Sequence, residues 1–92
     1  MKQVYLDNAA TTQVDPLVVE AMTEVLSNCY GNPSSSHSFG RQAKARIEMS
    51  RRKVASLLNA APSEIFFTSG GTEADNMVIN GAVKDLGVKR II

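Results

Sequence analysis

Residues 65–92 read IFFTSGGTEADNMVINGAVKDLGVKRII and contain the strongest structural pattern of the chain. Ile65-Phe66-Phe67 is a continuous apolar run, which is typical of a buried parallel strand. A Thr-Ser-Gly-Gly loop follows, and apolar residues then recur at helical spacing over 72–86 until Gly87 ends the pattern. Arg90-Ile91-Ile92 resembles the start of another strand. The order predicts a strand, a helix and a strand joined by a right-handed crossover.

Gly70 and Gly71 stand where this predicted helix begins. A helix start presents unpaired N–H groups and the positive end of the macrodipole, and both favour a bound phosphate. Glycines leave room for ligand oxygens and permit positive φ, while Thr72 adds a hydroxyl. The segment fits a phosphate site, and it fits equally a plain turn from a strand into a capped helix. It is neither a Walker loop nor a dinucleotide fingerprint.

The N-terminal part is expected to contain two helices and a loop. Asp15 can cap a helix and Pro16 suits its first position, which predicts a helix over 16–27. Residues 28–38, NCYGNPSSSHS, are mostly turn formers and predict an ordered or functional loop. An apolar stripe predicts a second helix over 39–59. Four basic residues lie largely off this stripe: Arg41, Lys44, Arg51 and Arg52.

The composition restricts the class of protein. Ninety-two residues, 43% hydrophobic and 21% charged, allow at most one small globular domain. A net charge of +1 argues against nucleic acid as the main partner. There is no apolar run that could span a membrane and no signal-peptide core. A single cysteine fits a reducing compartment, so we expect a cytoplasmic protein.

Three motifs together resemble the cysteine desulfurases, which are class-V aminotransferases of the fold-type I group. The motifs are YLDNAATT at 5–12, GNPSSSHSFGRQA at 31–43 and IFFTSGGTEADNMVI at 65–79. Enzymes of this family use pyridoxal 5′-phosphate (PLP), convert L-cysteine to L-alanine, and leave a persulfide on an enzyme cysteine for iron–sulfur cluster assembly. Selenocysteine lyases share these motifs, so they remain an alternative.

The resemblance implies a limited set of roles. Gly71 and Thr72 match the positions that bind the PLP phosphate, and Gly70 shapes the same turn. Asn8 and Ala9 match the stretch near the substrate carboxylate. The implied partners are L-cysteine, a second copy of the chain in a homodimer, and a sulfur-acceptor protein.

The resemblance also implies an incomplete α/β fold. Residues 1–62 would be an N-terminal helical and loop segment, and residues 63–92 the start of a PLP-binding large domain with a mainly parallel sheet. The family's PLP-binding lysine and persulfide-forming cysteine match no residue here, so no catalytic residue is assigned. We therefore expect an inactive fragment on its own. The alternative is a non-catalytic module that binds a phosphate-bearing ligand or associates with a partner.

Cys29 and His37 carry no chemical assignment. Cys29 matches no catalytic position of the family, and a small, partly buried thiol is the preferred interpretation. His37 lies in a polar loop, where a structural hydrogen bond is favoured over proton transfer. One histidine and one cysteine do not make a zinc site.

Overall fold

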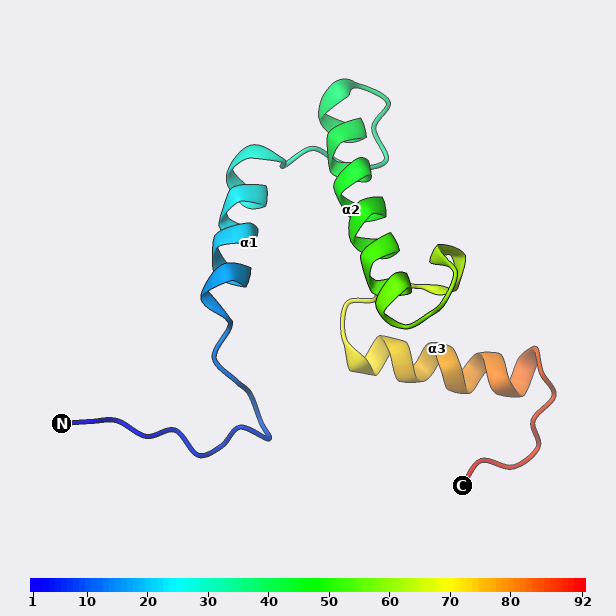
Figure 1. The fold of residues 1–92 in the computed structure, drawn as a ribbon. Coiled ribbons are helices and arrows are strands. Elements are labelled where there is room, and N and C mark those ends of the chain that lie inside the picture. The colour runs from blue at the N-terminus through cyan, green and yellow to red at the C-terminus, as the bar shows by residue number, and fades with distance from the viewer. The chain divides into compact units, whose positions relative to one another are not determined.

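A computed structural model describes all residues from Met1 to Ile92 (Figure 1). The elements are α1 (Pro16–Asn28), α2 (Ser38–Leu57), the short 3-10 helix η1 (Pro62–Glu64) and α3 (Gly71–Lys84). The chain forms two compact units, Met1–Ser50 and Arg51–Ile92, whose boundary falls inside α2. None of the helices combines the length and the apolar character needed to cross a membrane. The proposed domain boundary after residue 62 stays a prediction.

The α/β fold predicted from the sequence is wrong for this chain, because the structure contains helices and no strand. Ile65 has extended backbone angles (φ −100°, ψ 123°), as a strand residue would. Neither 65–67 nor 90–92 pairs with another extended segment, however. An apolar run indicates that a segment could form a strand, but a strand also requires a hydrogen-bonded neighbour. The strand–helix–strand unit is therefore absent.

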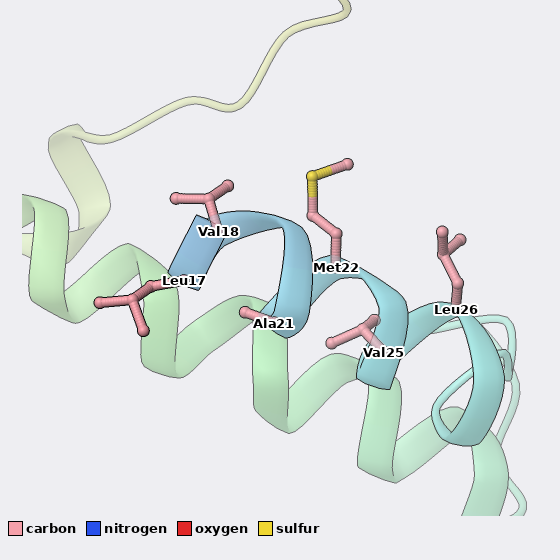
Figure 2. Close-up of a pocket in the computed structure, with 6 residues that line it drawn as sticks. All are labelled: Leu17, Val18, Ala21, Met22, Val25 and Leu26. Carbon is pink, nitrogen blue, oxygen red and sulfur yellow. The ribbon is translucent and has the colours of Figure 1, made fainter. Parts of the chain in front are cut away.

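α1 begins as the sequence predicts and ends one residue later than predicted. The Leu17 N–H donates to the Asp15 carboxylate at 2.8 Å, and Pro16 occupies the first turn, where its missing N–H costs nothing. The apolar face of this helix borders an open groove (Figure 2). The groove is lined by Leu17, Val18, Ala21, Met22, Val25 and Leu26.

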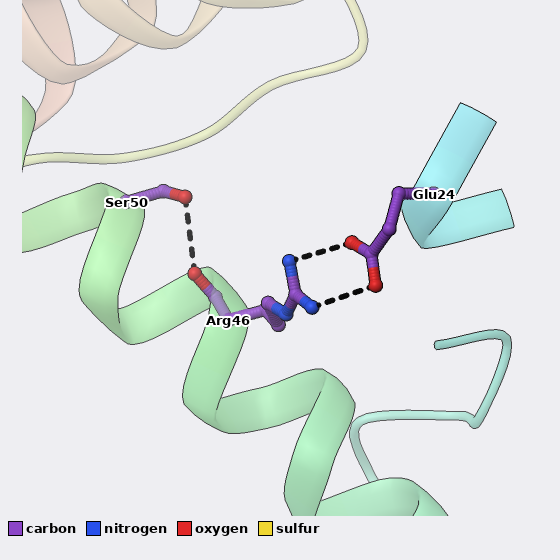
Figure 3. Close-up of polar contacts among 3 residues, drawn as sticks. All are labelled: Glu24, Arg46 and Ser50. Carbon is purple, nitrogen blue, oxygen red and sulfur yellow. Dashed lines mark hydrogen bonds and ion pairs between the residues drawn. The ribbon is translucent and has the colours of Figure 1, made fainter. Parts of the chain in front are cut away.

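An ion pair joins α1 to α2 within the first unit. The Arg46 guanidinium contacts the two carboxylate oxygens of Glu24 at 2.8 and 2.9 Å (Figure 3). The side chains are 46% and 42% exposed. Water and salt screen such a pair, so it contributes only about 0.2–1 kcal/mol to the free energy of unfolding.

α2 ends in a backbone motif that redirects the chain. Asn59 has a φ of +53°, the left-handed conformation that asparagine tolerates better than most residues. The Asn59 N–H donates to the Ser56 carbonyl at 3.3 Å, and the Ala60 N–H donates to the Ala55 carbonyl at 2.9 Å. These two bonds form a Schellman motif. The motif ends the helix two residues before the predicted end and starts the connection to α3.

The loop between α1 and α2 closes tightly around two glycines. A Cβ atom on Gly31 would lie 2.3 Å from the Phe39 carbonyl oxygen. A Cβ atom on Gly40 would lie 2.2 Å from the carbonyl oxygen of Ser35 and 2.6 Å from that of Asn32. Since these neighbours are backbone atoms, only glycine fits without a shift of the chain. The structure confirms a loop within the predicted 28–38, between the end of α1 at Asn28 and the start of α2 at Ser38.

We expect Gly40→Ala to lower the free energy of unfolding by about 1–3 kcal/mol, because the loop backbone must move to accommodate the methyl group. The matched control is Gly81→Ala inside α3, where the nearest atom to an added Cβ is 3.7 Å away. That change should raise stability by about 0.4–1 kcal/mol. Urea unfolding of the protein from the complete gene measures both. Equal effects of the two variants would contradict this account of the loop.

The chain buries very little apolar surface. Its buried apolar residues are Ala43, 7% exposed, and Ala55, 1% exposed, while Leu17, Leu26 and Leu57 are each at least 74% exposed. Stable helices in water need a covered apolar face, since helix propensity alone is marginal at these lengths.

This chain, prepared alone, should therefore self-associate or fold only in part. Sedimentation velocity across a dilution series, together with circular dichroism, would reveal concentration-dependent size and helicity. A sharp, well-dispersed amide NMR spectrum from a dilute monomer would be the opposite result.

Candidate functional site

The candidate site is the start of α3. Gly70 is the residue that precedes the helix, and no side chain caps it. The Ala74 N–H donates to the Gly70 carbonyl at 3.2 Å and is the first to find an acceptor in the helix. The N–H groups of Gly71, Thr72 and Glu73 have no intrahelical acceptor. Unpaired donors at the positive end of a helix favour an anion.

The glycine pair keeps this helix start open. A Cβ atom added to Gly70 or Gly71 would meet no other atom within 4 Å. Neither glycine adopts the left-handed conformation that glycine permits; Gly70 is extended, at φ 167° and ψ −177°, as any residue can be. Of the two properties expected of these glycines, the structure uses the space that they leave. A ligand oxygen can approach the N–H groups where other residues would place a side chain.

Hydrogen bonds among residues 68–73 hold the turn together. The Glu73 carboxylate accepts hydrogen bonds from the Ser69 hydroxyl and, at 2.9 Å, from the Ser69 N–H. The Thr68 hydroxyl donates to the Gly70 carbonyl at 3.1 Å. The bond from the Ser69 hydroxyl, followed by that from its N–H, lowers the pKa of Glu73 below its ordinary value. Glu73 is therefore ionised at neutral pH.

The turn should open in acid. Because the pKa of Glu73 is lower in the folded protein, its bonds to Ser69 contribute stability above the ordinary pKa of glutamate. That contribution disappears as the pH falls through the lowered value. An NMR titration of the Glu73 carboxyl carbon should give a midpoint below that of a free glutamate, and the Ser69 amide shift should follow it. In Glu73→Gln the Ser69 transition should vanish; a midpoint at or above the ordinary value would contradict the assignment.

An arginine of α2 holds the segment that leads into the turn. The Arg51 guanidinium donates to the Ile65 carbonyl oxygen and lies over the Phe67 ring, 4.9 Å from its centroid. Sequence reasoning placed Arg51 off the apolar stripe of its helix and gave it no further role. These partners are 14 and 16 positions away along the chain, and no local pattern signals such a contact.

The predicted site residues fall into two groups. Gly70, Gly71 and Thr72 lie together at the start of α3 in the second unit. Asn8 and Ala9 belong to the first unit and lie in an exposed turn. In this turn the Ala10 N–H donates to the Asp7 carbonyl at 3.1 Å. The assignment of Asn8 and Ala9 to a substrate carboxylate stays a prediction, as does that of the glycine–threonine turn to a phosphate.

Cys29 is partly buried and His37 makes a structural hydrogen bond, as expected from the sequence; that neither has a chemical role stays a prediction. Cys29 is a free, half-buried thiol at the end of α1. His37 directly precedes α2, and its Nδ1 atom accepts a hydrogen bond from the Gly40 N–H at 3.4 Å. Its ring meets the Phe39 ring edge-on, 6.2 Å between centroids. His37 therefore acts as a cap for α2.

Comparisons with known proteins agree with the motifs. Residues 4–92 match the aminotransferase class-V family. The chain is 50% identical over 90 residues to a protein named putative cysteine desulfurase IscS 1 from Bacillus subtilis (strain 168), and the match covers 95% of this chain and 24% of that protein. It is 52% identical over 92 residues to a cysteine desulfurase from Trichormus azollae, covering all of this chain and 23% of the relative.

Two further relatives extend the comparison. A selenocysteine lyase from Bos taurus is 47% identical over 83 residues, which are 90% of this chain and 19% of the lyase. A solved structure described as a NifS-like protein superposes with a TM-score of 0.87 at 43% identity, covering 94% of this chain and 24% of that one. The chain thus spans 19–24% of the length of these relatives. As its motifs predict, the chain belongs to the class-V aminotransferase family.

Proposed function

We propose that this chain is part of a PLP-dependent cysteine desulfurase that supplies sulfur for iron–sulfur clusters. L-cysteine and an enzyme thiol would give L-alanine and an enzyme persulfide: the carbon–sulfur bond of the substrate breaks, and a sulfur–sulfur bond forms on the enzyme cysteine. Family membership and relatives named as cysteine desulfurases support the proposal. The observation that carries it to this chain's own residues is the uncapped, open start of α3.

The residues of the turn fit the phosphate of PLP. The N–H groups of Gly71 and Thr72 would donate to its oxygens, the Thr72 hydroxyl would add a third donor, and Gly70 would leave the approach clear. When bound, PLP supplies the electron sink of the reaction. The part of this chain is to hold and orient the cofactor by its phosphate, while Asn8 and Ala9 would lie toward the substrate carboxylate.

The proposed setting follows from the family. The enzyme would work in the cytoplasm as a homodimer and pass sulfur to an acceptor protein. The single, unpaired cysteine of this chain fits a reducing compartment.

A selenocysteine lyase is the second candidate, supported by the Bos taurus relative. The two activities differ in whether the substrate's leaving atom is sulfur or selenium. Alanine release by the PLP-loaded protein from the complete gene, measured with L-cysteine and with L-selenocysteine, distinguishes them. Preference for L-cysteine supports the desulfurase. Release from L-selenocysteine alone favours the lyase, and release from neither leaves only a non-catalytic phosphate-binding role.

Thr72→Ala should weaken PLP binding about tenfold, the usual effect of losing a hydroxyl bond to a charged group. The dissociation constant is measured from the absorbance of bound PLP in the protein from the complete gene. Thr23→Ala is the matched control, because Thr23 lies in α1 and its hydroxyl donates to the Val19 carbonyl of its own helix. An unchanged dissociation constant in Thr72→Ala would remove the proposed phosphate site.

A further inference from the structure

Arg51 contacts the segment 65–67, just upstream of the candidate site. Its guanidinium donates to the Ile65 carbonyl oxygen and lies over the Phe67 ring, with 4.9 Å between the guanidinium carbon and the ring centroid. Arg51 and Ile65 are half-buried, whereas Phe66 between the two contacts is 70% exposed. Phe67, which lies under the guanidinium, is 51% exposed, so of the two rings the better covered one is on the side of Arg51.

Both contacts suit a guanidinium better than an ammonium. Arginine presents several donors in a fixed plane, and that plane can stack on an aromatic ring while one edge donates to a carbonyl. Lysine keeps the charge but offers a single rotating ammonium. Arg51 can therefore fix both the position of 65–67 and its rotation about its own axis.

The position of 65–67 determines the position of the turn that follows it. Only Thr68 and Ser69 separate Phe67 from Gly70, at most about 10 Å of extended chain. The bonds of Thr68 to Gly70 and of Ser69 to Glu73 make the turn a closed unit that moves with the segment before it. Donors in a binding site must be held within about 0.5 Å to work well.

We infer that Arg51 is a positioning residue for the phosphate site, which it serves by fixing 65–67 against the end of α2. This inference rests on the proposed function, because the ligand that the turn would hold is the phosphate of PLP. Arg51 itself does not touch that ligand in this account. Its effect passes through Ile65 and Phe67 to the N–H donors of Gly71 and Thr72.

The test compares Arg51→Lys with Arg52→Lys in the protein from the complete gene. Arg52 is the adjacent, exposed arginine of the same helix and serves as the control. In Arg51→Lys we expect the PLP dissociation constant to rise about tenfold, which is 1.4 kcal/mol. Hydrogen exchange of the amides over 66–72, measured without PLP, should also become about tenfold faster. Exchange over 41–49 and the thermal unfolding midpoint should stay unchanged, as should every value in Arg52→Lys.

A second variant keeps the inference testable if Arg51→Lys fails to fold. Phe67→Leu removes the ring and leaves the arginine. By itself it should raise the PLP dissociation constant and speed amide exchange over 66–72, and no change in either would overturn the inference. Where Arg51→Lys folds, the double variant should show less than the product of the single effects, because both changes disrupt one contact. Multiplicative effects would overturn the inference.

Thr72→Ala separates failure of this inference from failure of the proposed function. If Thr72→Ala weakens PLP binding and Arg51→Lys does not, the inference is overturned and the phosphate site stands. If Thr72→Ala has no effect, the proposed function fails and the inference fails with it. Global destabilisation by Arg51→Lys with an unchanged PLP dissociation constant would show a structural role only.

Discussion

The need to pair backbone N–H and carbonyl groups governs this chain more than a hydrophobic core does. Its buried apolar residues are two alanines, so the helices begin and end where local hydrogen bonding requires it. The carboxylate of Asp15 caps α1, and the imidazole of His37 caps α2. Asn59 closes the end of α2 in a left-handed conformation. At the start of α3 no side chain performs this task, and that exception is where the candidate site lies.

Sequence reasoning succeeded where the cause is local. Asp15-Pro16 located the start of α1. The predicted end of the third helix was two residues late, since α3 ends at Lys84, and Gly87, at a φ of +65°, lies in the turn beyond it. Capping and left-handed turns depend on residues within one or two turns of each other, so the amino-acid pattern contains the information. The family assignment succeeded for a related reason, since three spaced motifs were present in the chain itself.

Sequence reasoning failed where the structure depends on contacts between residues distant along the chain. Ile65-Phe66-Phe67 has the composition of a buried strand, yet a strand exists only if another segment pairs with it, and none does. Arg51 was missed for the same reason, because its partners at Ile65 and Phe67 come close only when the chain reverses after α2. For the glycine pair the sequence indicated both free space and access to positive φ, and the structure shows open space without the left-handed conformation, because composition cannot distinguish the two.

The charge of Glu73 is compatible with an anion site at the same helix start. A carboxylate in the first turn competes with a bound phosphate for the positive end of the helix. Here the carboxylate already accepts two hydrogen bonds from Ser69, which lies before the glycine pair. It thus leaves the donors of Gly71 and Thr72 to a ligand, and it also stiffens the turn that presents them.

A phosphate site built mainly from backbone donors does not distinguish between substrates that react at the other end of the cofactor. The N–H groups of Gly71 and Thr72 would hold a phosphate in the same way whether the leaving atom is sulfur or selenium. Relatives named for both activities accordingly match this chain at similar identity, 52% for a desulfurase and 47% for a selenocysteine lyase. Discrimination between the two substrates would therefore come from residues other than this turn, whose proposed role is the cofactor binding common to both.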